Sequence, residues 1–411
     1  MKILIWNPYV SLGGGLRLLL QLSDAIARHP DVKLVRLALP SGCINNHEIL
    51  NNKKVKIFEL NQLWLEKHQR ILGIKGTTRL KFLLRRLLPQ TLAKGKQKQF
   101  QNAIEDCDLI YCPWPHRLSF PITDKPVICT FQDATLLEFP EIIGGQATHL
   151  EWQLSKVWME KSTSIVVSSN STKERLIKQF GEICEKANII HHAILPETQQ
   201  KVPLVCSKLS DKLPKKYVIF PANIMTHKNH YNMLVAWSRF QRRKEFPLVL
   251  FGAGIEKLNY SNPNWPESWI ATRLTGVIYR TNLSLGEDIY ALGYVDDADV
   301  ISLISQATAL IMPTLAEGGG SFPVEEALTF GVPVLCSNIA IMQEHLSYRS
   351  AKIAWFDPDC PSSIVDALNN FFDNYSDYKQ SAIDGITDPR PSWNDIASQY
   401  VKVFHEALNK Y

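Results

Sequence analysis

A run of glycines bracketed by carboxylates is the part of this chain best suited to bind a ligand. Glycines let a ligand approach the backbone closely, and the free amides at the N-terminus of a helix favour anions. A carboxylate accepts hydrogen bonds from neighbouring hydroxyls of a neutral sugar. A site with both features suits a molecule with a diphosphate and several hydroxyls, which describes a nucleotide sugar. The candidate residues of this loop are Glu317, Gly318, Gly319, Gly320, Ser321, Phe322, Glu325 and Glu326.

Two buried strands must hold this loop in place. Residues 309–312 form a short apolar run that stops at Pro313, and residues 332–336 form another. Between them, residues 324–330 have helical spacing, with Pro323 in the first turn, where proline is tolerated. The order strand, glycine loop, helix, strand is typical of a parallel α/β sheet.

The stretch from 309 to 337 resembles the donor-site signature of the retaining family 4 (group 1) glycosyltransferases, which have the two-domain GT-B fold. In that family a glutamate begins the glycine loop, a second one follows after seven intervening residues, and the helix ends in Gly-x-Pro. Glu317 and Glu325 keep this spacing. Counted back from Gly331, however, Glu326 takes the place of the second glutamate. A one-residue insertion in the loop reconciles the two counts, and we favour Glu326.

A second candidate loop follows the strand predicted at residues 217–220 and opens a helix that we expect to run from Thr226 to about Arg242. It contains Asn223 and Lys228, and a lysine there could reach a diphosphate as a point charge. The resemblance implies an arginine and a lysine in this loop, both holding the donor phosphates. Asn223 takes the arginine position and Lys228 the lysine position. One cation is therefore lost, and helix amides or another basic side chain must meet the rest of the phosphate charge.

Two loops in the first half of the chain carry the remaining candidates. Gly14 and Gly15 lie between an apolar run at 2–6 and a helical pattern that ends at Arg28. The resemblance implies that these glycines face the cleft near the donor phosphates. Gln132 and Asp133 end another predicted strand, at the edge where open sheets bind ligands. Related enzymes often carry histidine where this chain has Gln132, which can hydrogen-bond but cannot act as an acid or base; Asp133 taken alone is more typical of a helix or turn cap.

Apolar runs alternate with helical segments along the whole chain, which predicts an α/β protein with parallel sheets. A length of 411 residues fits two domains. With the resemblance, this predicts two Rossmann-like, doubly wound domains that face each other across a cleft. We expect an acceptor-side domain at 1–200, a linker within 195–216 and a donor-binding domain at 201–390. A C-terminal helix within 391–411 would cross back to the first domain.

Charge and cysteine content exclude several classes of protein. The net charge of +5 does not imply a nucleic-acid partner, and the eight cysteines without a Cys-x-x-Cys pair indicate reduced thiols. No window reaches 18 consecutive apolar residues and no signal peptide is recognised, so we expect a cytosolic protein. The histidines at 191, 192, 227 and 230 lack carboxylates at ligand spacing, so neither a metal nor a cofactor is expected.

The basicity is concentrated in residues 67–98, which contain ten Lys or Arg and no acid. Residues 80–88 within this segment are amphipathic. Such a segment predicts either a contact with an anionic membrane surface, which would place the protein on the inner face of the membrane, or an exposed helix packed on the first domain.

Together, these features predict a retaining, metal-independent transfer of a mannose- or glucose-type hexose to a saccharide or lipid-linked acceptor in polysaccharide or glycan biosynthesis. The loop around Lys228 looks like the mannosyltransferase-like branch, so GDP-mannose and a UDP-hexose are both candidate donors. The resemblance implies that the departing phosphate takes the acceptor's proton, that Glu317 contacts the sugar and that Glu326 holds the ribose hydroxyls. A sugar-nucleotide 2-epimerase of the same fold and a non-catalytic nucleotide-sugar-binding protein are the alternatives. The absence of the Gly-x-Gly-x-x-Gly fingerprint argues against a dehydrogenase.

Overall fold

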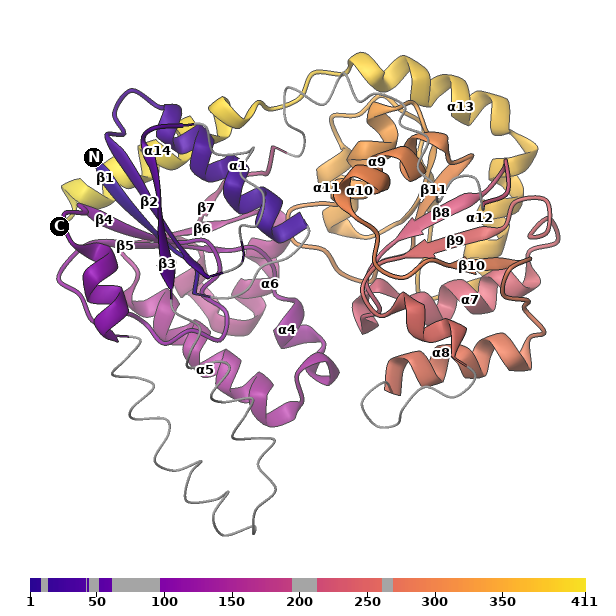
Figure 1. Cartoon of the computed structure of the whole chain (residues 1–411), viewed down its shortest axis with the longest axis horizontal. Helices are drawn as coiled ribbons and strands as arrows, with labels where there is room; N and C mark the ends of the chain where they lie inside the picture. Colours follow the sequence, from indigo (N-terminus) through magenta and orange to yellow (C-terminus); the bar gives the residue numbers. More distant parts are fainter. Residues whose placement is uncertain (9–13, 42, 44–51, 61–96, 194–212, 261–268) are drawn as a thin grey trace, which may run out of the picture.

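A computed structural model describes the chain except for residues 9–13, 42, 44–51, 61–96, 194–212 and 261–268 (Figure 1). The described part contains two parallel sheets, each formed by a continuous half of the chain. Parallel strands need crossover connections, and helices supply them in both halves. The predicted α/β class with two doubly wound domains is confirmed.

The first sheet has seven strands in the order β3-β2-β1-β4-β5-β6-β7. Alternate residues of β1 point to opposite faces, so Ile3 and Ile5 enter one core and Leu4 enters the other. The strands are β1 Lys2–Trp6, β2 Leu34–Pro40, β3 Val55–Leu60, β4 Leu109–Cys112, β5 Val127–Phe131, β6 Ser164–Val167 and β7 Asn188–Ile189. Its helices are α1 Gly14–Arg28, α4 Thr135–Glu138, α5 Gly145–Lys161 and α6 Asn170–Phe180, with short 3-10 turns η1 Pro140–Ile142 and η2 Gly181–Cys184.

The second sheet has six strands in the order β10-β9-β8-β11-β12-β13. Figure 1 shows α7 and α8 on one side of this sheet and α9, α10 and α11 on the other. The strands are β8 Val218–Pro221, β9 Leu248–Phe251, β10 Ile289–Ala291, β11 Ala309–Met312, β12 Val334–Ser337 and β13 Ala354–Phe356. The helices are α7 His230–Arg239, α8 Trp269–Arg280, α9 Asp297–Gln306, α10 Phe322–Thr329, α11 Ala340–Leu346, α12 Pro361–Asp373 and α13 Tyr375–Asp384, with 3-10 turns η5 Thr226–Lys228, η6 Ile255–Asn259 and η7 Gly385–Thr387.

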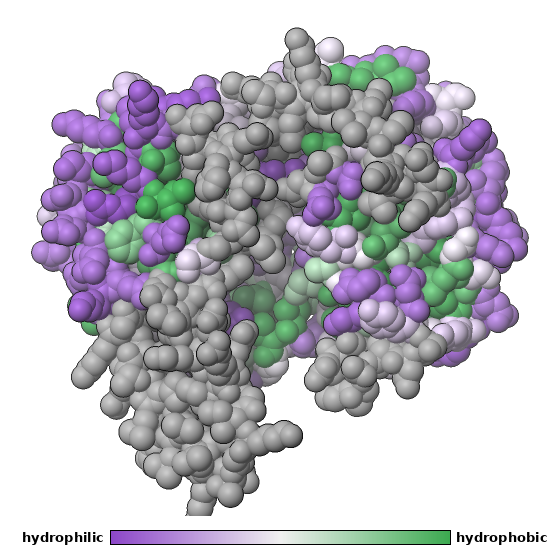
Figure 2. All heavy atoms as spheres, viewed as in Figure 1, coloured by the Kyte–Doolittle hydropathy of each residue, from purple (hydrophilic) through white to green (hydrophobic). Residues whose placement is uncertain are grey.

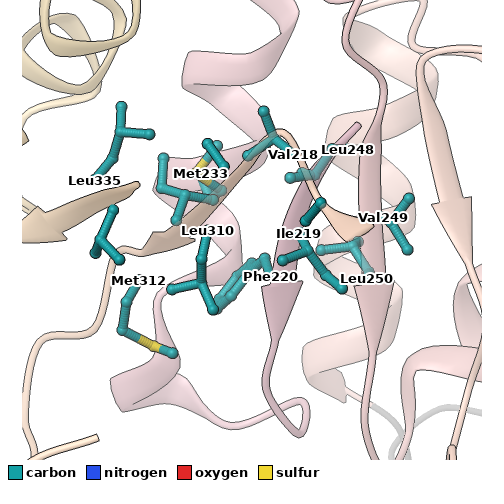
Figure 3. Close-up of a cluster of buried hydrophobic side chains, with 14 of the residues drawn as sticks. Val218, Ile219, Phe220, Met233, Leu248, Val249, Leu250, Leu310, Met312 and Leu335 are labelled. Carbon is teal, nitrogen blue, oxygen red and sulfur yellow. The ribbon is translucent and has the colours of Figure 1, made fainter. Parts of the chain in front are cut away.

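The core of the second sheet explains why its strands read as continuous apolar runs. Helices cover both faces, so neighbouring residues of one strand are buried on opposite sides. Figure 3 shows Val218, Ile219 and Phe220 of β8 beside Leu310 of β11, and all four are fully buried. The two middle strands therefore form a rigid base for the loops that follow them.

The C-terminal helix α14, Trp393–Asn409, returns to the first sheet, as predicted. A capping box between Ser392 and Asp395 begins it. Its buried Tyr400 places a hydroxyl 3.3 Å from Thr130 Oγ1 on β5. Figure 1 shows this yellow helix beside the first sheet, far from α13, which covers the second. The end of the chain thus ties the two halves together.

One predicted helix was wrong at its start. We expected a single helix from Thr226 to about Arg242, but η5 ends at Lys228 and α7 begins at His230. Asn229 between them has a left-handed backbone with φ +62°, and its side-chain amide donates to the carbonyl oxygens of Pro313 (2.9 Å) and Pro358 (2.7 Å). These tertiary hydrogen bonds break the helix and hold Lys228 on a turn.

Several sequence predictions fall on residues outside the described part. They are the domain boundary near residue 200, most of the linker at 195–216 and nearly all of the basic segment at 67–98. Figure 2 shows a largely hydrophilic outer surface over the described residues in this view, with apolar side chains in small groups. None of the described helices has the length and apolar character that a membrane crossing requires.

Candidate active site

The glycine loop between β11 and α10 is clamped against the first sheet. Ser169 Oγ and Thr172 Oγ1 donate hydrogen bonds to the Gly318 carbonyl oxygen, at 3.0 and 3.2 Å. A side chain at Gly318 would collide with the carbonyl oxygen of Gln132, which follows β5. The loop and the carboxyl ends of the first-sheet strands therefore touch directly, which only glycine permits here.

The next two glycines are equally constrained. A side chain at Gly319 would collide with the imidazole of His192, and one at Gly320 with that of His345. Gly320 also has φ +118°, a conformation that side chains rarely adopt. Burial, followed by the nearby His345, lowers the pKa of His192 to about 4, so this ring packs on the loop as a neutral group. Ser321 is buried and precedes the first turn of α10.

Lys228 and Glu317 meet at the start of this loop. Lys228 Nζ lies 2.5 Å from Glu317 Oε1, and their side chains are 21% and 11% exposed. The backbone brings them together, because the Leu315 amide donates to the His227 carbonyl oxygen at 2.7 Å. The sequence predicted both residues for the site, and the structure pairs them.

A second ion pair joins the two halves of the chain at the other end of the loop. Arg17 Nη2 on α1 lies 2.9 Å from Glu326 Oε1 on α10, and the Arg17 guanidinium lies over the Phe322 ring, 5.2 Å from its centroid. Gly14 adjoins the same ring. Sequence reasoning placed Gly14, Phe322 and Glu326 in the site but missed Arg17, because a pairing between distant helices leaves no local signal.

The two adjacent glutamates of α10 have different surroundings. Glu325 is buried within the second half of the chain, where it pairs with Arg349, accepts a hydrogen bond from the Tyr348 hydroxyl at 2.7 Å and lies 3.3 Å from His345 Nε2. Burial raises the pKa of Glu325, but His345 and Arg349 outweigh it and lower the pKa to about 2. Glu325 is therefore a core carboxylate that is ionised at neutral pH, whereas Glu326 faces the first half.

The polar side chains that follow β5 form hydrogen bonds with nearby backbone groups. Gln132 is buried and its side-chain amide donates to the Pro113 carbonyl oxygen at 3.2 Å. Asp133 Oδ1 accepts from the Thr135 amide at 2.8 Å. Burial raises the pKa of Asp133, yet His116 and the Thr135 amide outweigh it, so the net shift is downward. Asp133 is thus an ionised turn cap beside the cleft.

The two remaining predicted residues lie on either side of the site. Asn223, which takes the arginine position of the resemblance, is exposed and its Oδ1 accepts from the Ala253 amide at 2.7 Å. This bond ties the ends of β8 and β9 together. Gly15 begins α1 with Gly14 and adjoins the Trp114 ring.

Sequence reasoning also missed Arg175. Its Nη1 donates to the Glu317 carbonyl oxygen at 2.9 Å, and it pairs with Glu138. Arg175 is half-buried on α6, one turn beyond the residues that hold Gly318. It therefore fixes the backbone that carries Glu317 and adds positive charge there.

A cavity of about 650 Å³ lies beside the site, between α6 and α11. Glu344 of α11 crosses this boundary, where it accepts hydrogen bonds from the amides of Asn170 (2.6 Å) and Ser171 (2.8 Å). Its carboxylate also lies 2.9 Å from His191 Nε2. Capping α6 from the other half of the chain makes Glu344 a second clamp between the two sheets. Within the described residues, no cluster of three or more His, Cys, Asp or Glu could hold a metal ion.

One protein family is similar to most of the second half of the chain. The family described as Glycosyl transferases group 1 matches residues 207–385. Residues 207–385, called the group 1 region below, are thus similar to the group 1 glycosyltransferases. This group 1 region contains Lys228, Glu317 and the glycine loop, so both cation–carboxylate pairs draw their carboxylates from it.

The chain also resembles a curated protein in part of its sequence and solved structures in its fold. The chain is 25% identical over 237 residues to O-antigen chain mannosyltransferase B of Escherichia coli, a match that spans only 56% of each protein. Its fold is similar to that of sucrose-phosphate synthase from Thermosynechococcus elongatus, with TM-score 0.68, 15% identity and full coverage of both chains. HepE of Anabaena, in complex with UDP and glucose, matches with TM-score 0.68 and 16% identity over 99% of this chain and all of that one. The predicted GT-B fold is confirmed.

Proposed function

We propose that this protein is a retaining glycosyltransferase that moves a hexose from a nucleotide-diphosphate sugar to a saccharide or lipid-linked acceptor in polysaccharide biosynthesis. The observation that carries the proposal is the Lys228–Glu317 pair at the start of the glycine loop. It joins a cation suited to a phosphate and a carboxylate suited to sugar hydroxyls at one helix N-terminus. Residues 201–390 would bind the donor and residues 1–200 the acceptor, with 391–411 joining them.

Each side chain of the site has a role in this proposal. Lys228 and the amides of Gly318, Gly319 and Gly320 stabilise the diphosphate as it gains charge on leaving. Glu317 contacts the transferred sugar and Glu326 holds the ribose hydroxyls. Glu325 helps to hold the helix that carries Glu326 in place, since its own carboxylate is already bound to Arg349 and Tyr348. The remaining donor contacts are Gly14, Gly15, Ser321, Phe322 and Asn223.

The proton of the acceptor hydroxyl goes to the departing phosphate in this proposal. Gln132 has no titratable group and is buried, and Asp133 caps a turn, so neither needs to act as a strong base. Both residues shape the acceptor side of the cleft. The reaction is proposed to be independent of metal ions, since Lys228 and helix amides supply the positive charge.

The transferred hexose is proposed to be of the mannose or glucose type. The relative from Escherichia coli is named a mannosyltransferase, which favours mannose and a GDP-linked donor. The HepE structure contains UDP and glucose, which favours a UDP-linked donor. The basic segment at 67–98 would bring the protein to an anionic membrane surface, where lipid-linked acceptors are found.

A transfer assay with chemically defined donors tests the proposed function. The protein is incubated with GDP-mannose or UDP-glucose, with and without a lipid-linked or free saccharide acceptor, and the released nucleoside diphosphate is measured. We expect release that requires the acceptor, and a product with the anomeric configuration of the donor. Conversion of the donor to its 2-epimer without release would identify an epimerase. Tight donor binding without any product would identify a sensor.

A further inference from the structure

The glycine loop is flanked by a cation–carboxylate pair at each end. Lys228 pairs with Glu317 before the glycines, and Arg17 pairs with Glu326 on the helix after them. Lys228 belongs to the second half of the chain and Arg17 to the first. The loop between the two pairs is the one that we propose to hold the donor.

Arg17 lies in an unusual environment for an arginine. Its side chain is only 15% exposed, and Glu326 beneath it is 1% exposed. The buried Nε of Arg17 makes no hydrogen bond with any described residue. The planar face of the guanidinium lies over Phe322, the first residue of α10. The guanidinium of Arg17 therefore lies at the N-terminus of α10, and its Nε–H group is available to donate another hydrogen bond.

Separating a buried carboxylate from a largely buried guanidinium is unfavourable unless other polar groups replace the contacts that are lost. A nucleotide-diphosphate sugar offers both partners at once. Its ribose hydroxyls can donate to Glu326, and its phosphate oxygens can accept the fork of N–H groups on Arg17.

We propose that Arg17 is a diphosphate-binding residue supplied by the first half of the chain, and that donor binding exchanges the partners of the Arg17–Glu326 pair. This inference rests on the proposed function. In the exchange, Glu326 passes from Arg17 to the ribose hydroxyls, and Arg17 passes from Glu326 to a phosphate. Arg17 and Lys228 then hold the diphosphate from two sides, in place of two cations on the same loop.

The exchange has a consequence for the motion of the two halves. A phosphate held by Lys228 alone engages only the second half of the chain, whereas one held by Arg17 as well engages both. The donor diphosphate therefore favours the closed arrangement, in which water is excluded from the reacting sugar. Arg17 should add nothing to the affinity for a nucleoside without phosphates.

The test compares the affinities of a nucleoside, its monophosphate and its diphosphate for the wild-type protein and for Arg17→Gln, with the base that the wild type prefers. We expect Arg17→Gln to lower the affinity for the diphosphate about tenfold or more, because one charge-assisted hydrogen bond is lost, while the affinity for the nucleoside stays the same. Arg17→Lys keeps the charge but loses the fork, so its diphosphate affinity should lie between the two. Arg28→Gln at the far end of α1, where Arg28 pairs with Asp24, is the matched control and should change nothing.

Two outcomes would overturn the inference. One is an unchanged diphosphate affinity in Arg17→Gln, and the other is an equal loss for nucleoside and diphosphate, which indicates a structural role. If Arg17→Gln does not fold because Glu326 loses this cation, the double variant Arg17→Gln/Glu326→Gln removes both charges, and the ratio of diphosphate to nucleoside affinity must still fall. Failure of the wild type to bind any nucleoside diphosphate would instead contradict the proposed function itself.

Discussion

Lys228 Nζ and Glu317 Oε1 lie 2.5 Å apart although 89 positions separate these residues in the chain. The turn that carries Lys228 is held by Asn229, whose side chain binds the carbonyl oxygens of Pro313 and Pro358. The backbone that carries Glu317 is held in turn by Arg175 Nη1 and by the hydrogen bond between Leu315 and His227, so contacts within the protein fix both partners. Such preorganisation lets a charged pair act without reorganising during the reaction.

Replacing Lys228 by alanine should abolish most of the transfer activity without unfolding the protein. Loss of one preorganised contact to developing charge lowers the rate by about a hundredfold. Nucleoside diphosphate release and the melting temperature check both parts of this prediction. Lys216→Ala, which removes a lysine that pairs with Glu245, is the matched control and should keep the wild-type rate. A wild-type rate in Lys228→Ala would refute the assignment.

Glu326→Ala should also lose most of the activity, because the ribose hydroxyls lose their acceptor. The initial rate at fixed donor and acceptor concentrations is the measurement. Glu287→Gln is the control, since Glu287 is an exposed partner of Lys244 away from the loop. If Glu326→Ala transferred the sugar as fast as the wild type, Glu326 would not be a donor contact.

Gly318→Ala tests the contact between the glycine loop and the first sheet. The added methyl group would collide with the Gln132 carbonyl oxygen, so the two halves could not approach to their observed distance. A misplacement of this size lowers the rate on the order of a hundredfold. Gly145→Ala is the control and should keep the wild-type rate, because an added methyl group at Gly145 meets nothing within 4 Å. Equal rates for the two variants would show that this contact is not needed for transfer.

The Glu325–Arg349 pair should control stability, and not chemistry. Arg349→Leu leaves a buried carboxylate without its cation, which costs about 3–5 kcal/mol of unfolding free energy. Denaturant unfolding measures this loss, with Arg280→Gln as an exposed control. A cost below about 1 kcal/mol would mean that Glu325 is not held by Arg349.

The same network predicts a pH dependence. The pKa of Glu325 is lowered from 4.5 to about 2 in the folded protein, so the unfolded chain binds the proton more readily. The stabilisation by this carboxylate is therefore complete above pH 4.5 and is lost as the pH falls towards 2. The difference in unfolding free energy between the wild type and Glu325→Gln should shrink between pH 6 and pH 3. A difference that is constant across this range would contradict the lowered pKa.

The sequence was sufficient to predict features that depend only on residues close together in the chain. The buried strand Ala309–Met312, the glycine loop and Pro323 stand next to each other, so the strand–loop–helix unit could be predicted with nearly correct bounds. The return of the C-terminal helix came from the resemblance. The break at Asn229 was missed, because the hydrogen bonds that cause it come from Pro313 and Pro358.

The electrostatics of the site could not be predicted, since they depend on distant pairings. Spacing alone left the choice between Glu325 and Glu326 to an assumed insertion, whereas in the structure one carboxylate is enclosed by Arg349 and the other meets Arg17. Arg17 and Arg175 carried no motif of their own. Their importance follows only from the contact between the two sheets.

The central claim is that the second half of the chain binds a sugar joined to a nucleoside diphosphate. A thermal-shift series with UDP, GDP, ADP and their hexose derivatives at millimolar concentration tests it most directly. We predict that one base raises the melting temperature of the wild-type protein by several degrees, and that Lys228→Ala loses most of this shift. If none of these compounds raised the melting temperature of the wild type, the claim would be contradicted.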